Sequence, residues 1–159
     1  MGGLPSEIIL GHTLAQLLII AGQVTLLLII ALLAFGLPIY GSLGLVILLM
    51  SMLGLAGMLY GLCVSTISPE ESQAMQMALG SFFPVLLLSG VIWPLEAIPS
   101  PLSYVSIILP TTWAASAMRS VLLRGWDATH GGVWQALLVV LAWICLFLLL
   151  SVRGVRRIE

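Results

Sequence analysis

Four long stretches without a charged residue constrain what this sequence can fold into. A helix that crosses the roughly 30 Å hydrocarbon core of a membrane needs about 20 mostly apolar residues. Only 7% of the 159 residues are charged, which is too few to cover a water-soluble fold of this size. We therefore predict an all-α integral membrane protein with four transmembrane helices, at Leu14–Phe35, Leu43–Ile67, Ser72–Trp93 and Val133–Val152.

The charged residues also exclude several functions. The net charge of −1 provides no basic surface for DNA or RNA, so we expect membrane lipid as a partner and no nucleic acid. All five basic residues are arginines. The chain therefore has no lysine for a nucleotide-binding P-loop or for a Schiff base.

The segment before the last span, residues 95–125, is apolar but interrupted by prolines. Pro99, Pro101 and Pro110 are placed so that a straight fifth span is disfavoured. A re-entrant or interfacial pair of short helices fits better, because non-helical backbone at membrane depth must be buried in protein or line a water-filled cavity. We expect Pro110 to begin a short helix that runs towards Arg124.

The start of the third span carries a recognisable capping pattern. Ser68 is expected to be the helix N-cap, with Pro69 as the first helical residue and Glu71 as the capping-box partner. The two carboxylates of Glu70 and Glu71 would then lie at the positive end of the helix dipole.

Small and polar residues on the expected spans are candidates for helix packing or for a substrate path. The second span has small residues at helical spacing, which favours close packing, with a substrate groove as the alternative. Gln23 falls near mid-membrane, where an unpaired amide is costly, so it should face another helix or a cavity. Pro84 should kink the third span. The small-residue stripe consists of Gly54, Gly57, Gly61 and Ser65.

No pattern in the sequence supports catalysis or metal binding. His12 and His130 are assigned to opposite sides of the membrane and have no nearby Cys, Asp or Glu at ligand spacing. No Gly-x-Ser-x-Gly elbow or P-loop is present, and no span holds an ionisable group. We predict no catalytic, cofactor-binding or metal-binding residue and no enzyme activity in this chain itself.

The arginines predict the orientation in the membrane. Arg153, Arg156 and Arg157 follow the last span, whereas Arg119 and Arg124 precede it. The positive-inside rule then places the C-terminus in the cytoplasm. Counting back through four spans places the N-terminus on the same side and residues 95–132 on the outer side.

Three runs of sequence resemble a known family. They are Phe82–Pro99 (FFPVLLLSGVIWPLEAIP), Leu109–Arg119 (LPTTWAASAMR) and Leu123–Trp126 (LRGW). Together they resemble the ABC transmembrane type-2 domain, and within it the G and H subfamilies of ABC half-transporters. The likeness covers about residues 4–153.

The resemblance implies that residues 1–159 are the C-terminal part of such a domain, the last four of six membrane helices. The nucleotide-binding domain and two spans would lie in sequence outside this chain, and we expect Met1 to mark a truncation. ATP and Mg²⁺ would act on that domain, so no cofactor is expected here. Two membrane domains would pair as a homodimer or heterodimer around a central path.

The same resemblance assigns roles to individual residues. Glu7 and His12 would lie in the cytoplasmic coupling region, and residues 95–124 would form an outer gate. Glu96 is a candidate ion-pair partner for Arg119 or Arg124, with a solvated carboxylate as the alternative. The candidate path-lining residues are Gln23, Gln76 and Pro84, and the candidate gate residues are Trp93, Glu96, Pro99, Pro110 and Arg119.

The predicted function is the membrane-domain portion of an ATP-driven ABC exporter in the plasma membrane. It would form half of a translocation path for lipids or hydrophobic compounds. The alternative is a four-helix structural or assembly membrane protein without transport activity. A P-loop and two further spans encoded in frame upstream of Met1 would favour the exporter.

Overall fold

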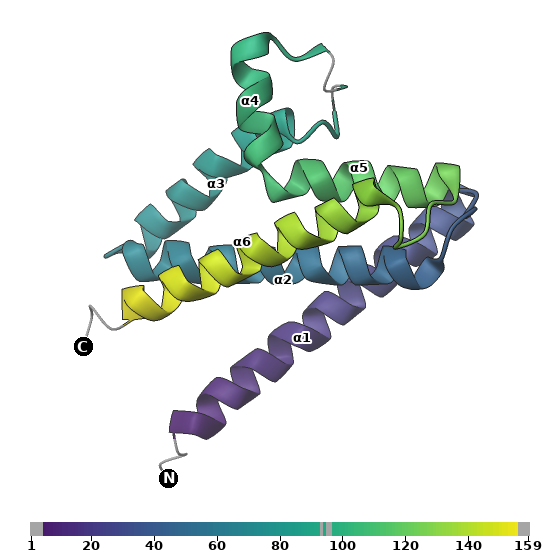
Figure 1. Cartoon of the computed structure of the whole chain (residues 1–159). Coiled ribbons are helices and arrows are strands. Elements are labelled where there is room, and N and C mark those ends of the chain that lie inside the picture. The colour runs from purple at the N-terminus through teal and green to yellow at the C-terminus, as the bar shows by residue number, and fades with distance from the viewer. Residues whose placement is uncertain (1–4, 93, 95–96, 156–159) are drawn as a thin grey trace. The chain divides into compact units, whose positions relative to one another are not determined.

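The computed structural model describes residues 5–92, 94 and 97–155, and the chain divides into two units, Met1–Pro38 and Ile39–Glu159 (Figure 1). Every regular element among the described residues is a helix and none is a strand. This confirms the predicted all-α class.

The first unit contains one long helix. Helix α1 spans Pro5–Ile29 and continues into a π-helical turn, η1, at Ile30–Ala34. The Thr25 hydroxyl donates to the carbonyl of Ala21 at 2.8 Å, so this polar group is satisfied within its own helix. Gly36 follows with φ of 55°, a left-handed conformation that glycine adopts without steric cost.

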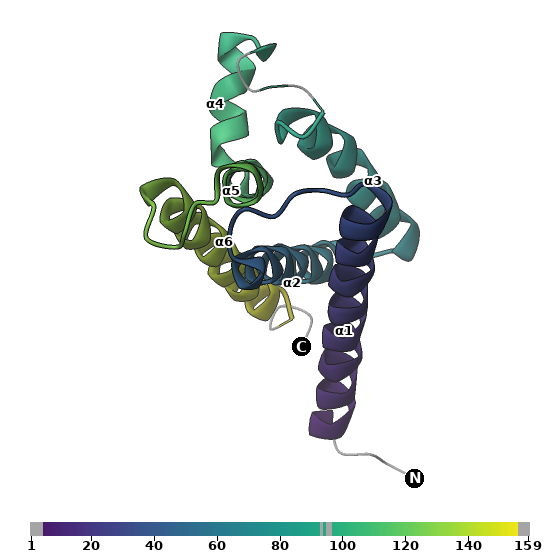
Figure 2. The same cartoon turned by 90° about the vertical axis from the view of Figure 1, so that its right-hand side faces the viewer.

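The second unit is built around three helices that pack side by side (Figure 2). Leu49 and two alanines, Ala117 and Ala136, form the centre of this core. The small alanine side chains let the helix backbones approach closely, as in other membrane bundles. The described residues of the unit form α2 (Leu43–Ile67), α3 (Glu71–Leu88), α4 (Ser100–Ile108), α5 (Pro110–Arg124) and α6 (Gly131–Val155), and α2, α5 and α6 form the core.

Helices α2 and α6 run parallel to each other (Figure 1). Leu49 and Ala136, near the beginnings of the two helices, share one core cluster. Near their ends, the Cys63 thiol lies 3.0 Å from the Ser151 hydroxyl. The chain that joins α2 to α6 must therefore return to the end from which both helices start.

In the part of the chain that the structure describes, three helices are long and apolar enough to cross a membrane: Leu14–Ala34, Leu43–Ile67 and Gly131–Gly154. Helix α3 has 18 residues and is not among them, because its first half carries Glu71, Gln73 and Gln76. The three-helix count does not confirm the predicted four spans.

The predicted N-cap at Ser68 is wrong. The Ser68 N–H donates to the carbonyl of Val64 at 3.1 Å, so Ser68 ends α2 instead. Glu70 is extended and is the N-cap residue of α3, which begins at Glu71. Because Ser68 already closes one helix, the chain uses Pro69 and Glu70 to change direction before the next helix can begin.

Candidate functional site

Helix α5 carries a buried apolar face and a polar face. Its buried residues include Ala114, Ala117 and Val121. The polar residues recur at intervals of three or four, which places them in one row along the helix. This row consists of Thr112, Ser116, Arg119 and Ser120.

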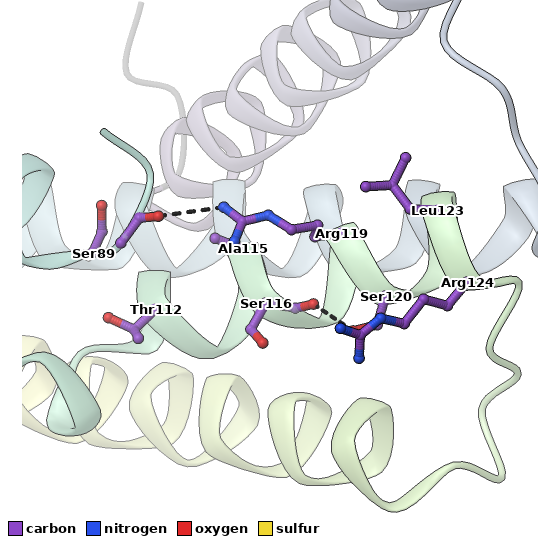
Figure 3. Close-up of a pocket in the computed structure, with 9 residues that line it drawn as sticks. Ser89, Thr112, Ala115, Ser116, Arg119, Ser120, Leu123 and Arg124 are labelled. Atoms are coloured by element: carbon purple, nitrogen blue, oxygen red, sulfur yellow. Dashed lines mark hydrogen bonds between the residues drawn. The ribbon is translucent and has the colours of Figure 1, made fainter. Parts of the chain in front are cut away.

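The polar face of α5 lines a cavity of about 230 Å³ (Figure 3). Ser89 and Gly90, in the turn after α3, form the wall across from α5. The guanidinium of Arg119 reaches this wall and donates to the Gly90 carbonyl at 3.3 Å. Gly90 has φ of 74°, so the turn uses the one residue that accepts this conformation readily. We call this cavity the α5 pocket.

A second arginine lies at the end of the α5 pocket. Arg124 is the last residue of α5, and its guanidinium lies 5.2 Å from the centre of the Trp126 ring. Trp126 in turn stacks on His130, with 4.7 Å between the ring centres. The cation–π contact holds Arg124 without neutralising its charge.

The hydroxyl groups of the pocket differ in whether they already donate a hydrogen bond to the protein. Ser89 donates to the carbonyl of Leu86 at 2.8 Å, and Ser120 donates to that of Ser116 at 2.9 Å. Thr112 is only 5% exposed, yet its hydroxyl has no hydrogen-bond partner among the described residues. Buried polar groups in native proteins nearly always have a partner, so this hydroxyl is an exception that needs a reason.

The break between α4 and α5 lies beside the middle of α6. The indole N–H of Trp143 donates to the carbonyl of Ile108 at 2.9 Å, and that of Trp113 donates to the carbonyl of Ile107 at 2.6 Å. Pro110 has no N–H, so it cannot donate to a carbonyl of α4. Because the two indoles bond carbonyls at the break, these carbonyls are satisfied by protein groups, as the predicted re-entrant element would require.

The predicted gate residues are distributed around α4 and α5. Pro99 is the N-cap residue of α4, Pro110 begins α5, and Arg119 lies in the α5 pocket. Trp93 and Glu96 lie outside the residues that the structure describes, so the proposed pairing of Glu96 with an arginine stays a prediction.

The predicted path-lining residues do not meet in one place within a unit. Gln76 and Pro84 are both exposed on α3. Gln23 is exposed in the first unit, whose single long helix offers it no neighbour. Their role as path residues stays a prediction. Glu7 and His12 lie within α1, and their side chains are outside the described part of the structure.

The small-residue stripe of α2 lies away from the buried side of that helix. Gly57, Gly61 and Ser65 are exposed, Gly54 is half-buried, and no atom comes within 4 Å of a Cβ built at Gly57 or Gly61. The buried residues of α2 are Val46, Leu49, Ala56, Leu59, Cys63 and Val64. The stripe is therefore open in the single chain, and its packing role stays a prediction.

Sequence reasoning missed most of the α5 pocket. The row of Thr112, Ser116 and Ser120 was detectable, because its helical spacing is visible in the sequence once Pro110 is taken as a helix start. The wall formed by Ser89 and Gly90 was not, since only the fold brings the end of α3 to α5. Among the described residues, no group of three or more His, Cys, Asp or Glu could hold a metal ion.

The family model and the relatives that match this chain point to the same family. Residues 4–123 match the family model described as ABC-2 type transporter. The chain is 40% identical over 152 residues to ABC transporter G family member 20 of Dictyostelium discoideum, which covers 96% of the chain and 21% of that protein. Over 140 residues it is 34% identical to G family member 23 of the same organism, covering 88% and 20% of the two proteins.

A bacterial relative shows a similar likeness. The probable multidrug ABC transporter permease YbhS of Escherichia coli strain K12 is 31% identical over 101 residues, which covers 63% of the chain and 27% of that protein. The chain thus spans about a fifth of the length of the two Dictyostelium relatives. No solved structure matches the chain.

Proposed function

The chain belongs to the ABC-2 type transporter family, and from this premise we propose that it forms half of a translocation path in an ATP-driven exporter. The observation that carries the proposal is the family match, which extends over residues 4–123 and so includes the α4–α5 element. The cargo would be lipids or hydrophobic compounds. ATP would be hydrolysed by an ABC nucleotide-binding domain that works with this chain.

Helix α3 is proposed as the fourth crossing of the membrane. Two parallel neighbouring spans, α2 and α6, require an odd number of crossings between them. Helix α3 has 18 residues and a length of about 27 Å, which nearly matches the hydrocarbon core. Its polar first half disfavours contact with lipid. We place Gln76, together with Pro84, against the central path for this reason.

Helices α4 and α5 are proposed as a re-entrant gate. The bond from Trp143 to the Ile108 carbonyl supports a joint at mid-depth, since Trp143 lies halfway along the apolar stretch of α6. Helix α4 would enter the membrane as far as this joint, and helix α5 would return to the side from which α4 entered. A gate of this kind would open by rigid movement of helices rather than by chemistry on side chains.

The pairing of two membrane domains is supported by the surface that α2 leaves open. The exposed stripe of Gly57, Gly61 and Ser65 would allow close approach of another helix. We propose a homodimer or heterodimer in the plasma membrane with the C-terminus in the cytoplasm. Glu7 and His12 would then lie on the cytoplasmic side, near the nucleotide-binding domain.

The proposal is tested by transport in lipid vesicles that contain the chain together with its nucleotide-binding domain. A fluorophore-labelled phosphatidylcholine and a hydrophobic cationic dye are the two cargoes. We expect ATP-dependent movement of at least one of them, and its loss when the P-loop lysine of the nucleotide-binding domain is replaced by alanine. Movement that survives this replacement would overturn the proposal. Normal ATP hydrolysis without movement of either cargo would favour a structural or assembly role.

A further inference from the structure

The Arg124 end of the α5 pocket lies at the level at which α2 and α6 begin. The N–H of Tyr40, just before α2, donates to the carbonyl of Leu122 at 3.1 Å and so holds the end of α5 at this level. Arg124 ends α5 here, and Arg119 precedes it by five residues, or about 7.5 Å along the helix. Phospholipid headgroups occupy this interfacial depth.

Both arginines of the pocket are exposed in the single chain, and neither contacts a carboxylate among the described residues. The guanidinium of Arg119 contacts the Gly90 carbonyl, and that of Arg124 contacts the Trp126 ring. Neither partner carries a negative charge. Ionisable groups within the membrane are costly and usually mark a functional site or a polar partner.

The pocket is richer in donors than in acceptors. Each guanidinium has five N–H groups, and Arg119 uses one of them on Gly90. The buried Thr112 hydroxyl adds a donor that is without a partner among the described residues. Ser116, which lines the same pocket, adds a hydroxyl in the next turn of α5. A ligand with several acceptor oxygens and negative charge would accept hydrogen bonds from Arg119 and from a hydroxyl beside it.

We propose that the α5 pocket binds one phosphate group. Its tetrahedral oxygens can accept paired hydrogen bonds from the planar fork of Arg119 while also reaching a hydroxyl donor. The apolar side chains of Leu123 and Ala115 line the same pocket and would contact carbon atoms attached to the phosphate. The phosphate can belong to a phospholipid headgroup or to free inorganic phosphate, and both are tested below.

The test uses the full protein that contains this chain, purified in detergent without ATP. Dioleoyl phosphatidylglycerol is titrated against it, and dioleoylglycerol, which lacks the phosphate, is the matched probe. We expect Arg119→Gln to weaken phosphatidylglycerol binding about tenfold, which is the effect of losing one strong charge-assisted hydrogen bond. Arg153→Gln is the matched control, since it removes an exposed arginine at the opposite end of α6. Arg153→Gln should bind phosphatidylglycerol with the same affinity as the wild type.

Thr112→Val provides a second variant that keeps the shape of the side chain. It should weaken phosphatidylglycerol binding several-fold without loss of folded protein. Equal affinity of wild type, Arg119→Gln and Thr112→Val would overturn the proposal, as would equal binding of dioleoylglycerol. If Arg119→Gln does not fold, the Thr112→Val result alone decides.

Competition with inorganic phosphate identifies the source of the group. Displacement of phosphatidylglycerol by millimolar inorganic phosphate supports a site that a soluble phosphate can fill. Failure of inorganic phosphate to compete, with binding still dependent on Arg119, supports a site for phospholipid. Binding is measured without ATP, so the two proposals are tested separately. If phosphatidylglycerol does not bind, the transport proposal still stands. If transport fails, the proposed phosphate site still stands.

Discussion

Seven hydroxyl groups among the described residues donate to a carbonyl three or four residues earlier in the chain. Thr25 donates to Ala21, Ser106 to Leu102 and Ser120 to Ser116. This local bonding lets serine and threonine lie in apolar helices without a partner from another helix. Thr111 and Thr112 depart from the pattern, because neither hydroxyl has a partner among the described residues, and of the two only Thr112 is a buried residue that lines the α5 pocket.

Replacing Thr112 should therefore stabilise the protein when no ligand is bound. Thr112→Val removes an unsatisfied buried hydroxyl at nearly constant volume, and we expect a gain of about 1 kcal/mol in the free energy of unfolding. Reversible unfolding in mixed detergent micelles measures this change. The matched variant is Ser106→Ala, which removes a buried hydroxyl with a hydrogen bond and should destabilise the protein. A loss of stability in both variants would contradict the prediction.

Gly41 lies at a close approach between the chain before α2 and helix α5. A Cβ at this position would collide with the backbone carbonyl oxygen of Val121, a fully buried residue. We expect Gly41→Ala to lower the free energy of unfolding by about 1–3 kcal/mol, because the carbonyl of a packed helix cannot move aside. Gly131→Ala is the control, since nothing lies within 4 Å of its added Cβ. Equal stabilities of the two variants in micelles would refute this prediction.

At the scale of elements, the α4–α5 joint shows how a break in a helix is tolerated beside a membrane span. Leu109 and Pro110 interrupt the helix, and the carbonyls of Ile107 and Ile108 turn to the indoles of Trp113 and Trp143. The prolines predicted the break. The tryptophan partners come from other positions in the fold, one of them 35 residues away.

Removal of the Trp143 donor should loosen the joint. Trp143→Phe retains an aromatic ring but leaves the Ile108 carbonyl unpaired, which should cost about 1–3 kcal/mol of the free energy of unfolding. Trp134→Phe is the control, because Trp134 is 56% exposed on the same helix. Protease digestion of the joint, followed by mass spectrometry, should be faster in Trp143→Phe only. Identical digestion rates would show that the indole is not needed.

At the scale of the whole molecule, the parallel arrangement of α2 and α6 supports the proposed crossing by α3. Hydropathy selects α2 and α6 but not α3, whose first half is polar. The parallel pair nevertheless requires the chain between them to change sides. We infer that α3 crosses the membrane beside a polar surface rather than in contact with lipid all around.

The sides of the membrane can be distinguished by cysteine labelling in intact cells. We expect Thr129→Cys to react with a membrane-impermeant maleimide from outside, whereas Glu70→Cys should react only after permeabilisation. Both positions are exposed, which removes burial as a cause of any difference. Wild type, with its cysteines Cys63 and Cys145, is the background control. Labelling of both new cysteines from the same side would refute the crossing by α3.

Local patterns in the sequence were enough to predict the all-α class of this protein and most of its helices. The expected span at residues 43–67 coincides with α2, and Pro110 begins α5 as predicted. Such features are local, because apolar length, proline and helical spacing act within a few turns of one chain segment. Ser68 was misassigned because a serine before a proline can either close one helix or open the next, and the local pattern does not distinguish the two.

Tertiary structure alone decided which residues meet. The α5 pocket joins Gly90 to Arg119 across 29 residues, and the α2–α6 seam joins Cys63 to Ser151 across 88. No periodicity in the sequence encodes these pairs, since they depend on how helices pack and on the direction in which each runs. The sequence by itself therefore determined a helical membrane protein with a proline-broken segment before its last span. Only packing decided that this segment places two arginines and a threonine, unpaired within the described residues, around one pocket.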